Sequence, residues 1–207
     1  MRKKKVGAIA IKSFALLVVL GTAYQAMAQD ATTPYPNMAP IEQYLMDRTA
    51  EIALARSAAP ESISRDADVL VFGRHGFETA VKSKNGFVCI VERPWTSAAN
   101  PDFWNPKVRT PICYNPAAAR SYLPRNIKRT DLILAGDTKT QTDETIVAAV
   151  DKKELPAMEP GAMCFMMSNQ GYGGDRIELA SPPHVLLFAD RPRKLGSESA
   201  GLSHPCF

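Results

Sequence analysis

The sequence lacks a hydrophobic run long enough to cross a membrane, and this absence decides how its first residues are interpreted. A spanning helix needs about 20 apolar residues, whereas the main apolar run covers only residues 14–20. Basic residues at positions 2–5 precede this run, and Ala26-Met27-Ala28 follows it. That order is typical of a secretory signal peptide with its cleavage site. We therefore predict that residues 1–28 are removed during export and that no membrane segment remains.

A surplus of positive charge is also missing once the leader is set aside. The whole chain has 25 Lys and Arg residues and 21 Asp and Glu residues, and the first 28 residues hold five of the basic ones and no acidic one. The mature chain then has 20 basic and 21 acidic side chains, a net charge of −1. Nucleic-acid binding requires a basic surface that neutralises phosphates, so the charge argues against a nucleic-acid partner.

Several catalytic and metal-binding motifs are absent as well. The chain has no Gly-x-Ser-x-Gly elbow and no Cys-x-x-Cys pair, and its glycine-rich segment at 169–175 lacks the Lys-Ser/Thr of a phosphate-binding loop. Only three histidines occur, His75, His184 and His204. The sequence therefore predicts no cofactor and no zinc finger, and it leaves few side chains that could act as a general base.

Four cysteines follow the leader, and their even number is typical of disulfides in an oxidising compartment. Three pairings are possible. We favour Cys89–Cys113, which closes the shortest loop, and this choice leaves Cys164–Cys206 as the second pair. The 179 residues that remain after cleavage are enough for one domain with a normal core.

Hydrophobic periodicity predicts a helix that opens at Pro40 and ends near Ser57, after a Pro- and Thr-rich lead-in. Apolar runs predict strands over 68–72, 77–83 and 87–93. Asn85-Gly86 is a strong signal for a two-residue hairpin turn between the last two strands. In that register Glu78 faces Arg93, and Glu92 ends an otherwise apolar face. Helices are expected over 117–122, over 126–135 and from Thr140 or Thr142 to about Leu155, and further strands over 162–168, 177–180 and 184–189.

The order of helix, strands, helices and strands predicts a single α+β domain with an antiparallel sheet and helices packed on one face. We divide the chain into four parts on this basis. They are the signal peptide (1–28), a lead-in and helix (29–57), the core domain (58–192) and a tail (193–207).

Three large aromatic side chains, Trp95, Phe103 and Trp104, lie in a proline-rich loop over residues 94–111. Long loops are usually functional or disordered, and three aromatic residues argue against disorder. The three side chains either cap the core or form a wall on which a ligand stacks.

Two further patterns point to chemistry. His184, with Glu92 or His75, could supply the acid and base of a hydrolase. Soft ligands near the end of the chain are typical of copper(I) sites, but alternation along a strand splits them between two faces, as in a Met-filled core strand. These soft ligands are Met163, Cys164, Met166, Met167 and His184.

The strings NGFVCIVERPW, FWNP, PICYNP and PGAMCFMMSNQGY resemble a family of secreted bacterial proteins of unknown activity. The resemblance covers roughly residues 58–190. It implies a single exported domain and no particular mechanism.

Together these features predict a soluble exported protein, periplasmic or extracellular, with a binding or structural role. Its partner is a small molecule or a protein of unknown identity, contacted by Trp95, Phe103, Trp104, Glu92 and His184. The two alternatives are a hydrolase that uses His184 with Glu92 or His75, and a copper-binding protein.

Overall fold

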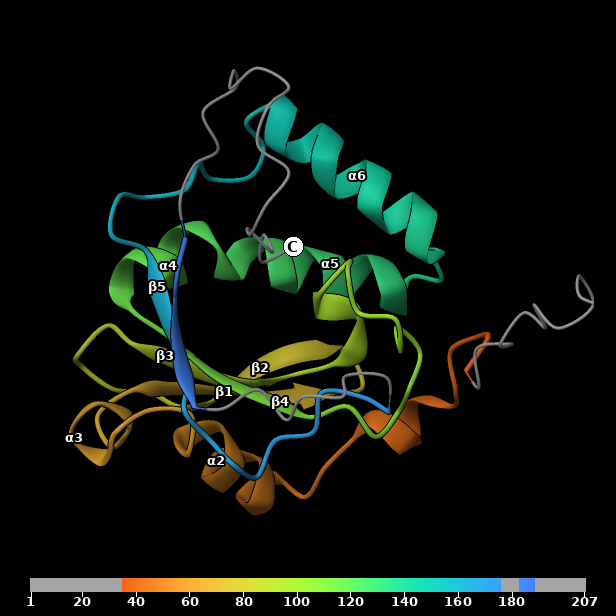
Figure 1. Ribbon diagram of the computed structural model, residues 1–207. Helices are drawn as coiled ribbons and strands as arrows, with labels where there is room; N and C mark the ends of the chain where they lie inside the picture. Colours follow the sequence, from red (N-terminus) through yellow and green to blue (C-terminus); the bar gives the residue numbers. More distant parts are fainter. Residues whose placement is uncertain (1–34, 176–182, 189–207) are drawn as a thin grey trace, which may run out of the picture. The chain divides into compact units, whose positions relative to one another are not determined.

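A six-stranded sheet organises the described part of the computed structural model, residues 35–175 and 183–188 (Figure 1). All neighbouring strands are antiparallel except β1 and β3, which are parallel. The expected α+β class is therefore confirmed, with a mixed rather than a purely antiparallel sheet. The strands, in their spatial order, are β2 (Gly76–Val81), β1 (Asp68–Gly73), β3 (Val88–Glu92), β4 (Thr110–Tyr114), β5 (Met163–Met166) and β6 (His184–Leu187).

Helices cover both faces of this sheet, whereas the sequence led us to expect them on one face (Figure 1). The reason is visible in β3, where Cys89 and Val91 pack against α2 and Ile90 packs on the opposite side with α4 and α5. A continuous apolar run is typical of a strand that is buried on both faces. The helices are η1 (Ile41–Tyr44), α2 (Arg48–Arg56), α3 (Glu61–Ser64), η2 (Pro94–Thr96), α4 (Pro116–Ser121), α5 (Leu123–Leu134) and α6 (Lys139–Asp151).

None of the helices in the described ranges is long and apolar enough to cross a bilayer. The predicted leader, the 177–180 strand, the tail and both His204 and Cys206 lie outside the described residues.

The predicted hairpin at Asn85-Gly86 is wrong. Strand β2 pairs with β1 through a tight turn after Gly73, and β3 pairs with the other edge of β1. Because β1 lies between β2 and β3, residues 82–87 carry the chain from one edge of β1 to the other. Asn85 instead donates from Nδ2 to the carbonyl of Ile63 at 2.8 Å. Glu78 consequently does not face Arg93.

The observed bounds of other elements are compared with the predicted ones as follows: one helix is divided, one strand is new and one helix is confirmed. Asp47 caps α2 by accepting from the amide of Ala50 at 2.9 Å, which splits the predicted 40–57 helix into η1 and α2. Strand β4 was not expected, because Pro111 falls within it. The predicted helix at 117–122 is confirmed as α4, with Asn115 as its cap.

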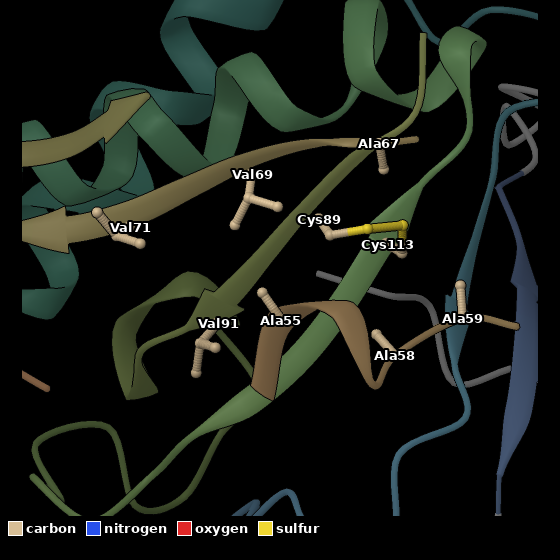
Figure 2. Packing of buried hydrophobic residues seen from close by; sticks show 9 residues of the cluster. All are labelled: Ala55, Ala58, Ala59, Ala67, Val69, Val71, Cys89, Val91 and Cys113. Atoms are coloured by element: carbon tan, nitrogen blue, oxygen red, sulfur yellow. A yellow bond between two sulfur atoms is a disulfide. The ribbon is translucent and has the colours of Figure 1, made fainter. Parts of the chain in front are cut away.

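The face that α2 covers, called here the α2 face, is built around the disulfide Cys89–Cys113 (Figure 2). The two cysteines are directly opposite on β3 and β4, with their Cα atoms 4.0 Å apart, so the predicted pairing is confirmed. Ala55 and Ala58, on either side of the predicted boundary at residue 57, share this cluster. Cys164 is buried in β5, and its predicted bond to Cys206 stays a prediction because Cys206 is not described.

Candidate functional site

Four polar side chains from four elements meet on the other side of the sheet, called here the α5 face. Glu92 ends β3 and continues the row of Val88 and Ile90, which points toward α5 because side chains alternate along a strand. Tyr114 ends β4 directly opposite Val88 and therefore lies on the same face. Asn126 comes from the first half of α5, and Thr96 from η2.

Hydrogen bonds join these residues into one network around the Glu92 carboxyl group. Asn126 donates from Nδ2 to Glu92 Oε1 at 2.6 Å and to the Tyr114 hydroxyl at 2.7 Å. The Tyr114 hydroxyl itself donates to Glu92 Oε1. Thr96 Oγ1 lies 3.1 Å from Glu92 Oε2. We refer to Glu92, Thr96, Tyr114 and Asn126 as the Glu92 cluster.

The cluster is buried, yet water still reaches part of Glu92. The exposed fractions are 0% for Tyr114, 3% for Asn126 and 4% for Thr96, whereas Glu92 is only half-buried. Protein atoms crowd its carboxyl group all the same, and this desolvation raises the pKa of Glu92, against the smaller opposing effect of the hydrogen bonds from Tyr114, Thr96 and Asn126.

The same environment raises the pKa of Tyr114 well above its usual value, first through burial and then through the charge that Glu92 carries when ionised. Both shifts favour the uncharged forms. Two neutral groups in contact avoid the free-energy cost of burying an uncompensated charge.

The distances between the oxygen atoms agree with a protonated Glu92. Thr96 has a single hydroxyl hydrogen, and its Oγ1 lies 2.7 Å from the carbonyl oxygen of Arg93 as well as 3.1 Å from Glu92 Oε2. If Glu92 carries its proton on Oε2, that proton is donated to Thr96, and Thr96 donates to Arg93. In this series of hydrogen bonds the Glu92 proton and the Thr96 hydroxyl hydrogen each have an acceptor, so the carboxyl group acts as a hydrogen-bond donor.

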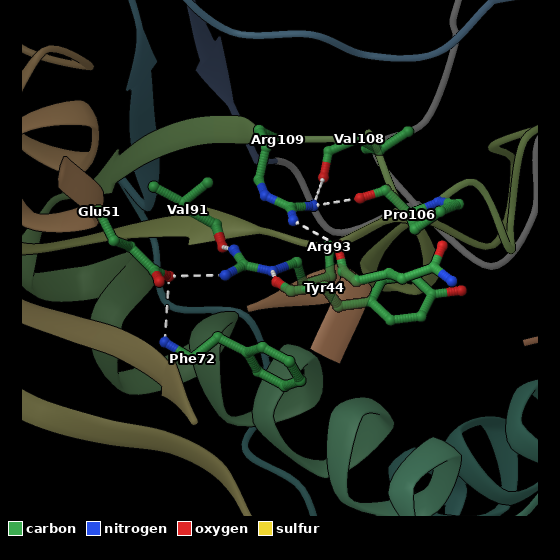
Figure 3. A network of polar contacts seen from close by, with 9 residues as sticks. Tyr44, Glu51, Phe72, Val91, Arg93, Pro106, Val108 and Arg109 are labelled. Atoms are coloured by element: carbon green, nitrogen blue, oxygen red, sulfur yellow. Dashed lines mark hydrogen bonds and ion pairs between the residues drawn. The ribbon is translucent and has the colours of Figure 1, made fainter. Parts of the chain in front are cut away.

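Arg93, which directly follows β3, points to the α2 face and forms a separate buried network (Figure 3). Its Nη2 donates to Glu51 Oε1 at 2.9 Å, and the side chains of Arg93 and Glu51 are 0% and 1% exposed. The Phe72 amide donates to the same Oε1 at 3.0 Å. Arg93 Nε also donates to the Tyr44 carbonyl at 2.9 Å, which ties η1 to the sheet.

Burial lowers the pKa of Arg93 to about 10, so the guanidinium remains charged at neutral pH and Glu51 compensates that charge. Nothing in the sequence indicated this ion pair, since Glu51 has the pattern of an ordinary helical residue. The signal that could have indicated it is the apolar run at residues 88–91, which places Arg93 directly after a largely buried strand.

The predicted histidine partners do not come within direct reach of Glu92. His184 begins β6 opposite Met166, and β6 is separated from β3 by β4 and β5. Three strand spacings correspond to about 14 Å, which is longer than the two side chains can bridge. His75 is exposed in the turn between β1 and β2.

The three aromatic residues of the 94–111 loop mainly build the core. Trp95 is fully buried, packs against Tyr44 and Phe72, and donates from Nε1 to Thr130 Oγ1 at 3.1 Å. Phe103 is 5% exposed, and Trp104 meets it edge-on while staying half-buried. Trp95 and Phe103 therefore cap the core, and they offer no free ring face to a ligand.

The soft side chains of β5 remain divided as their alternation predicts. Cys164 and Met166 point toward the α5 face, together with His184, whereas Phe165 packs on the α2 face. Within the described residues, no three His, Cys, Asp or Glu side chains gather where they could hold a metal ion.

Comparison of the chain with protein-family models, with curated proteins and with solved structures gives no match.

Proposed function

We propose that this protein is an exported binding protein and that the Glu92 cluster is its ligand-contacting site. The observation that supports the proposal is the partial exposure of Glu92 above three buried partners that fix its position. Within the described residues, Oε1 has two hydrogen-bond partners and Oε2 has one, so Oε2 is the atom left for a ligand.

The chemistry of the cluster selects the class of ligand. With its proton donated to Thr96, the neutral carboxyl group of Glu92 still offers Oε2 as an acceptor, and the fixed amide of Asn126 adds no charge. An anionic ligand would force the nearby carboxyl group to stay protonated, and a cation would have to ionise it. A small uncharged molecule that donates a hydrogen bond, such as a primary amide, fits this acceptor best.

Binding can be tested by NMR titration of the mature chain with three probes: acetamide, acetic acid and glucose. We expect saturable shifts of the Asn126 side-chain amide with acetamide, and loss of these shifts in Glu92→Ala. Glu144→Gln, which changes an exposed carboxyl group on α6, is the matched control and should titrate like the wild type. If no probe shifts Asn126, the cluster serves stability only and the proposal fails.

Export is the second element of the proposal. The leader motif supports it, and the Cys89–Cys113 bond is compatible with an oxidising compartment. Expression of the full chain with its own leader in a secreting bacterium should yield a protein whose first residue is Gln29. A soluble cytosolic product that begins at Met1 would refute export.

A hydrolase is the second candidate, and the raised pKa of Glu92 is the observation that favours it. Glu92 would act as the general acid, positioned by Tyr114 and Asn126, without a histidine. Activity toward nitrophenyl esters or glycosides should then fall with rising pH as Glu92 ionises, and should vanish in Glu92→Gln. If none of these substrates is turned over, the hydrolase candidate fails and the binding role stands alone.

A further inference from the structure

A small hollow lies on the α2 face, between the start of α2 and the antiparallel pair of β1 and β2. Val71 belongs to the core cluster of this face. Gly73 and Glu78 lie on the same side, because Gly73 is two residues further along β1 and Glu78 pairs with Val71. The volume of the hollow is about 270 Å³, just below the range of about 300–1,000 Å³ that is typical of ligand sites. The hollow therefore suits a small molecule and is too small for a peptide or a nucleotide.

Part of the lining of this hollow is apolar. Leu45 and Met46 come from the chain before α2, and Val71 comes from β1. Gly73 adds no side chain, and a Cβ atom at this position would lie no closer than 3.6 Å to any atom outside its chain neighbours. The space above β1 is therefore open at Gly73, next to apolar side chains that can contact an apolar group of a ligand.

An ion pair joins α2 to β2 at this hollow. Arg48 Nη1 donates to Glu78 Oε1 at 2.6 Å, and both residues belong to the lining. Their side chains are 52% and 62% exposed, so water screens the attraction and the pair contributes little to stability. A ligand can therefore separate the two groups at small cost, provided that it gives each of them a new partner. Arg74 is a second exposed guanidinium in the lining, and it is paired with Glu42.

A buried carboxylate completes the lining. Glu51 is 1% exposed, and the two hydrogen bonds that it accepts within the described residues, from Phe72 and Arg93, both go to Oε1 (Figure 3). Oε2 accepts none from this part of the chain. Because the contacts at Oε1 hold the carboxylate in place, Oε2 is a fixed acceptor for a donor group in the hollow, and it suits an ammonium group.

We propose that this hollow binds a free α-amino acid with an apolar side chain. The carboxylate of the ligand replaces Glu78 as the partner of Arg48, and its ammonium group pairs with Glu78 and donates to Oε2 of Glu51. Its side chain fills the space over Gly73. A ligand with a single charge would leave either Arg48 or Glu78 without a partner, and this difference favours a zwitterion over an amine or an acid. The site lies on the face opposite the Glu92 cluster and does not depend on the role proposed for that cluster.

Isothermal titration calorimetry of the mature chain tests the class of ligand with L-leucine and two analogues that each lack one charge. 3-Methylbutylamine lacks the carboxylate, and 4-methylpentanoic acid lacks the ammonium group. We expect saturable binding of leucine, and binding of each analogue about tenfold or more weaker, because each loses a charge-assisted hydrogen bond. Absence of leucine binding, or an equal affinity for either analogue, would overturn the proposal.

Gly73→Val tests the place of binding and should abolish the binding of leucine. The new side chain fills the space over β1 without backbone strain, since φ at Gly73 is not positive and a Cβ atom fits there. Thr79→Val is the matched control, because Thr79 follows Glu78 on β2 and points to the other side of the sheet. It should bind leucine like the wild type. Undiminished binding in Gly73→Val would contradict the proposed site.

Removal of one charge is a second test that leaves the hollow open. Arg48→Gln should weaken leucine binding about tenfold or more, because the ligand carboxylate loses its partner. Its affinity for 3-methylbutylamine should not fall, since the amine has no group that pairs with Arg48. Circular dichroism verifies that each variant is folded, as expected after the loss of an exposed ion pair. An affinity for leucine equal to that of the wild type would refute the assigned role of Arg48 and with it the proposal.

Discussion

At the residue scale, two adjacent ionisable residues, Glu92 at the end of β3 and Arg93 directly after it, are stabilised in opposite ways. Arg93 points to the α2 face, where the Glu51 carboxylate balances its charge. Glu92 points to the α5 face, where Tyr114, Thr96 and Asn126 are neutral partners. A buried charge needs a counter-charge or must be neutralised by a proton. Arg93 therefore stays ionised, and Glu92 is driven toward its acid form.

The raised pKa of Glu92 predicts a pH dependence of stability. A carboxyl group whose pKa is higher in the folded chain stabilises the fold fully below its unfolded pKa. That contribution is lost as pH rises through the folded pKa, with a slope of at most about 1.4 kcal/mol per pH unit for one proton. Urea unfolding of wild type and Glu92→Gln between pH 4 and 8 should show the variant gaining relative stability as pH rises.

Glu144→Gln, at an exposed position, serves as the control for this series, and its difference from wild type should change much less with pH. A constant difference between wild type and Glu92→Gln over the whole range would show that folding does not raise the pKa of Glu92.

The buried ion pair predicts a large loss of stability on removal of one charge. Glu51→Gln leaves the Arg93 guanidinium buried without a counter-charge, which typically costs about 3–5 kcal/mol. Urea denaturation at pH 7 measures this loss. The exposed pair Arg48 and Glu78 is the control, and Glu78→Gln should have only a small effect because water screens such pairs. Similar losses in both variants would refute the assigned role of burial.

At the element scale, side-chain caps decide where helices begin. Thr138 caps α6 with a capping box in which the Gln141 side chain accepts from the Thr138 amide at 2.9 Å. The expected caps, Thr140 and Thr142, lie inside the helix. The Thr-x-x-Gln spacing was present in the sequence and predicts the observed start.

Loss of this cap should destabilise the protein by about 1 kcal/mol in Thr138→Ala. Thr140→Ala is the control, because residue 140 is already within α6 and its side chain caps nothing in the described residues. Thermal or urea unfolding compares the two variants. A greater loss in Thr140→Ala would mean that α6 begins later than the structure places it.

At the scale of the whole molecule, one covalent bond joins the central strands β3 and β4. The Cys89–Cys113 bond spans 24 positions of sequence and lies within the α2-face core. Closing a loop of this length is expected to stabilise the fold by about 3–4 kcal/mol, mainly by restricting the unfolded chain. The bond and the helices on both faces together hold the strands on which the Glu92 cluster is built.

Replacement of both cysteines by alanine should therefore lower the unfolding free energy by about 3–4 kcal/mol. Addition of dithiothreitol should bring the wild type to a similar stability. If dithiothreitol lowers the unfolding free energy of the double variant further, that loss indicates the predicted Cys164–Cys206 bond. If dithiothreitol leaves the wild type unchanged at equilibrium, the stabilising role of Cys89–Cys113 is refuted.

The sequence by itself determined the α+β class, the Cys89–Cys113 pairing and most elements, because periodicity, caps and loop length are local properties. It also placed Glu92 at the end of an apolar face, although it derived this from the wrong hairpin. Only the tertiary structure decided that β1 lies between β2 and β3, since strand partners are chosen by burial of both faces rather than by a turn signal. For the same reason, only the fold separated His184 from Glu92, placed Trp95 in the core and brought Tyr114 and Asn126 to the carboxyl group.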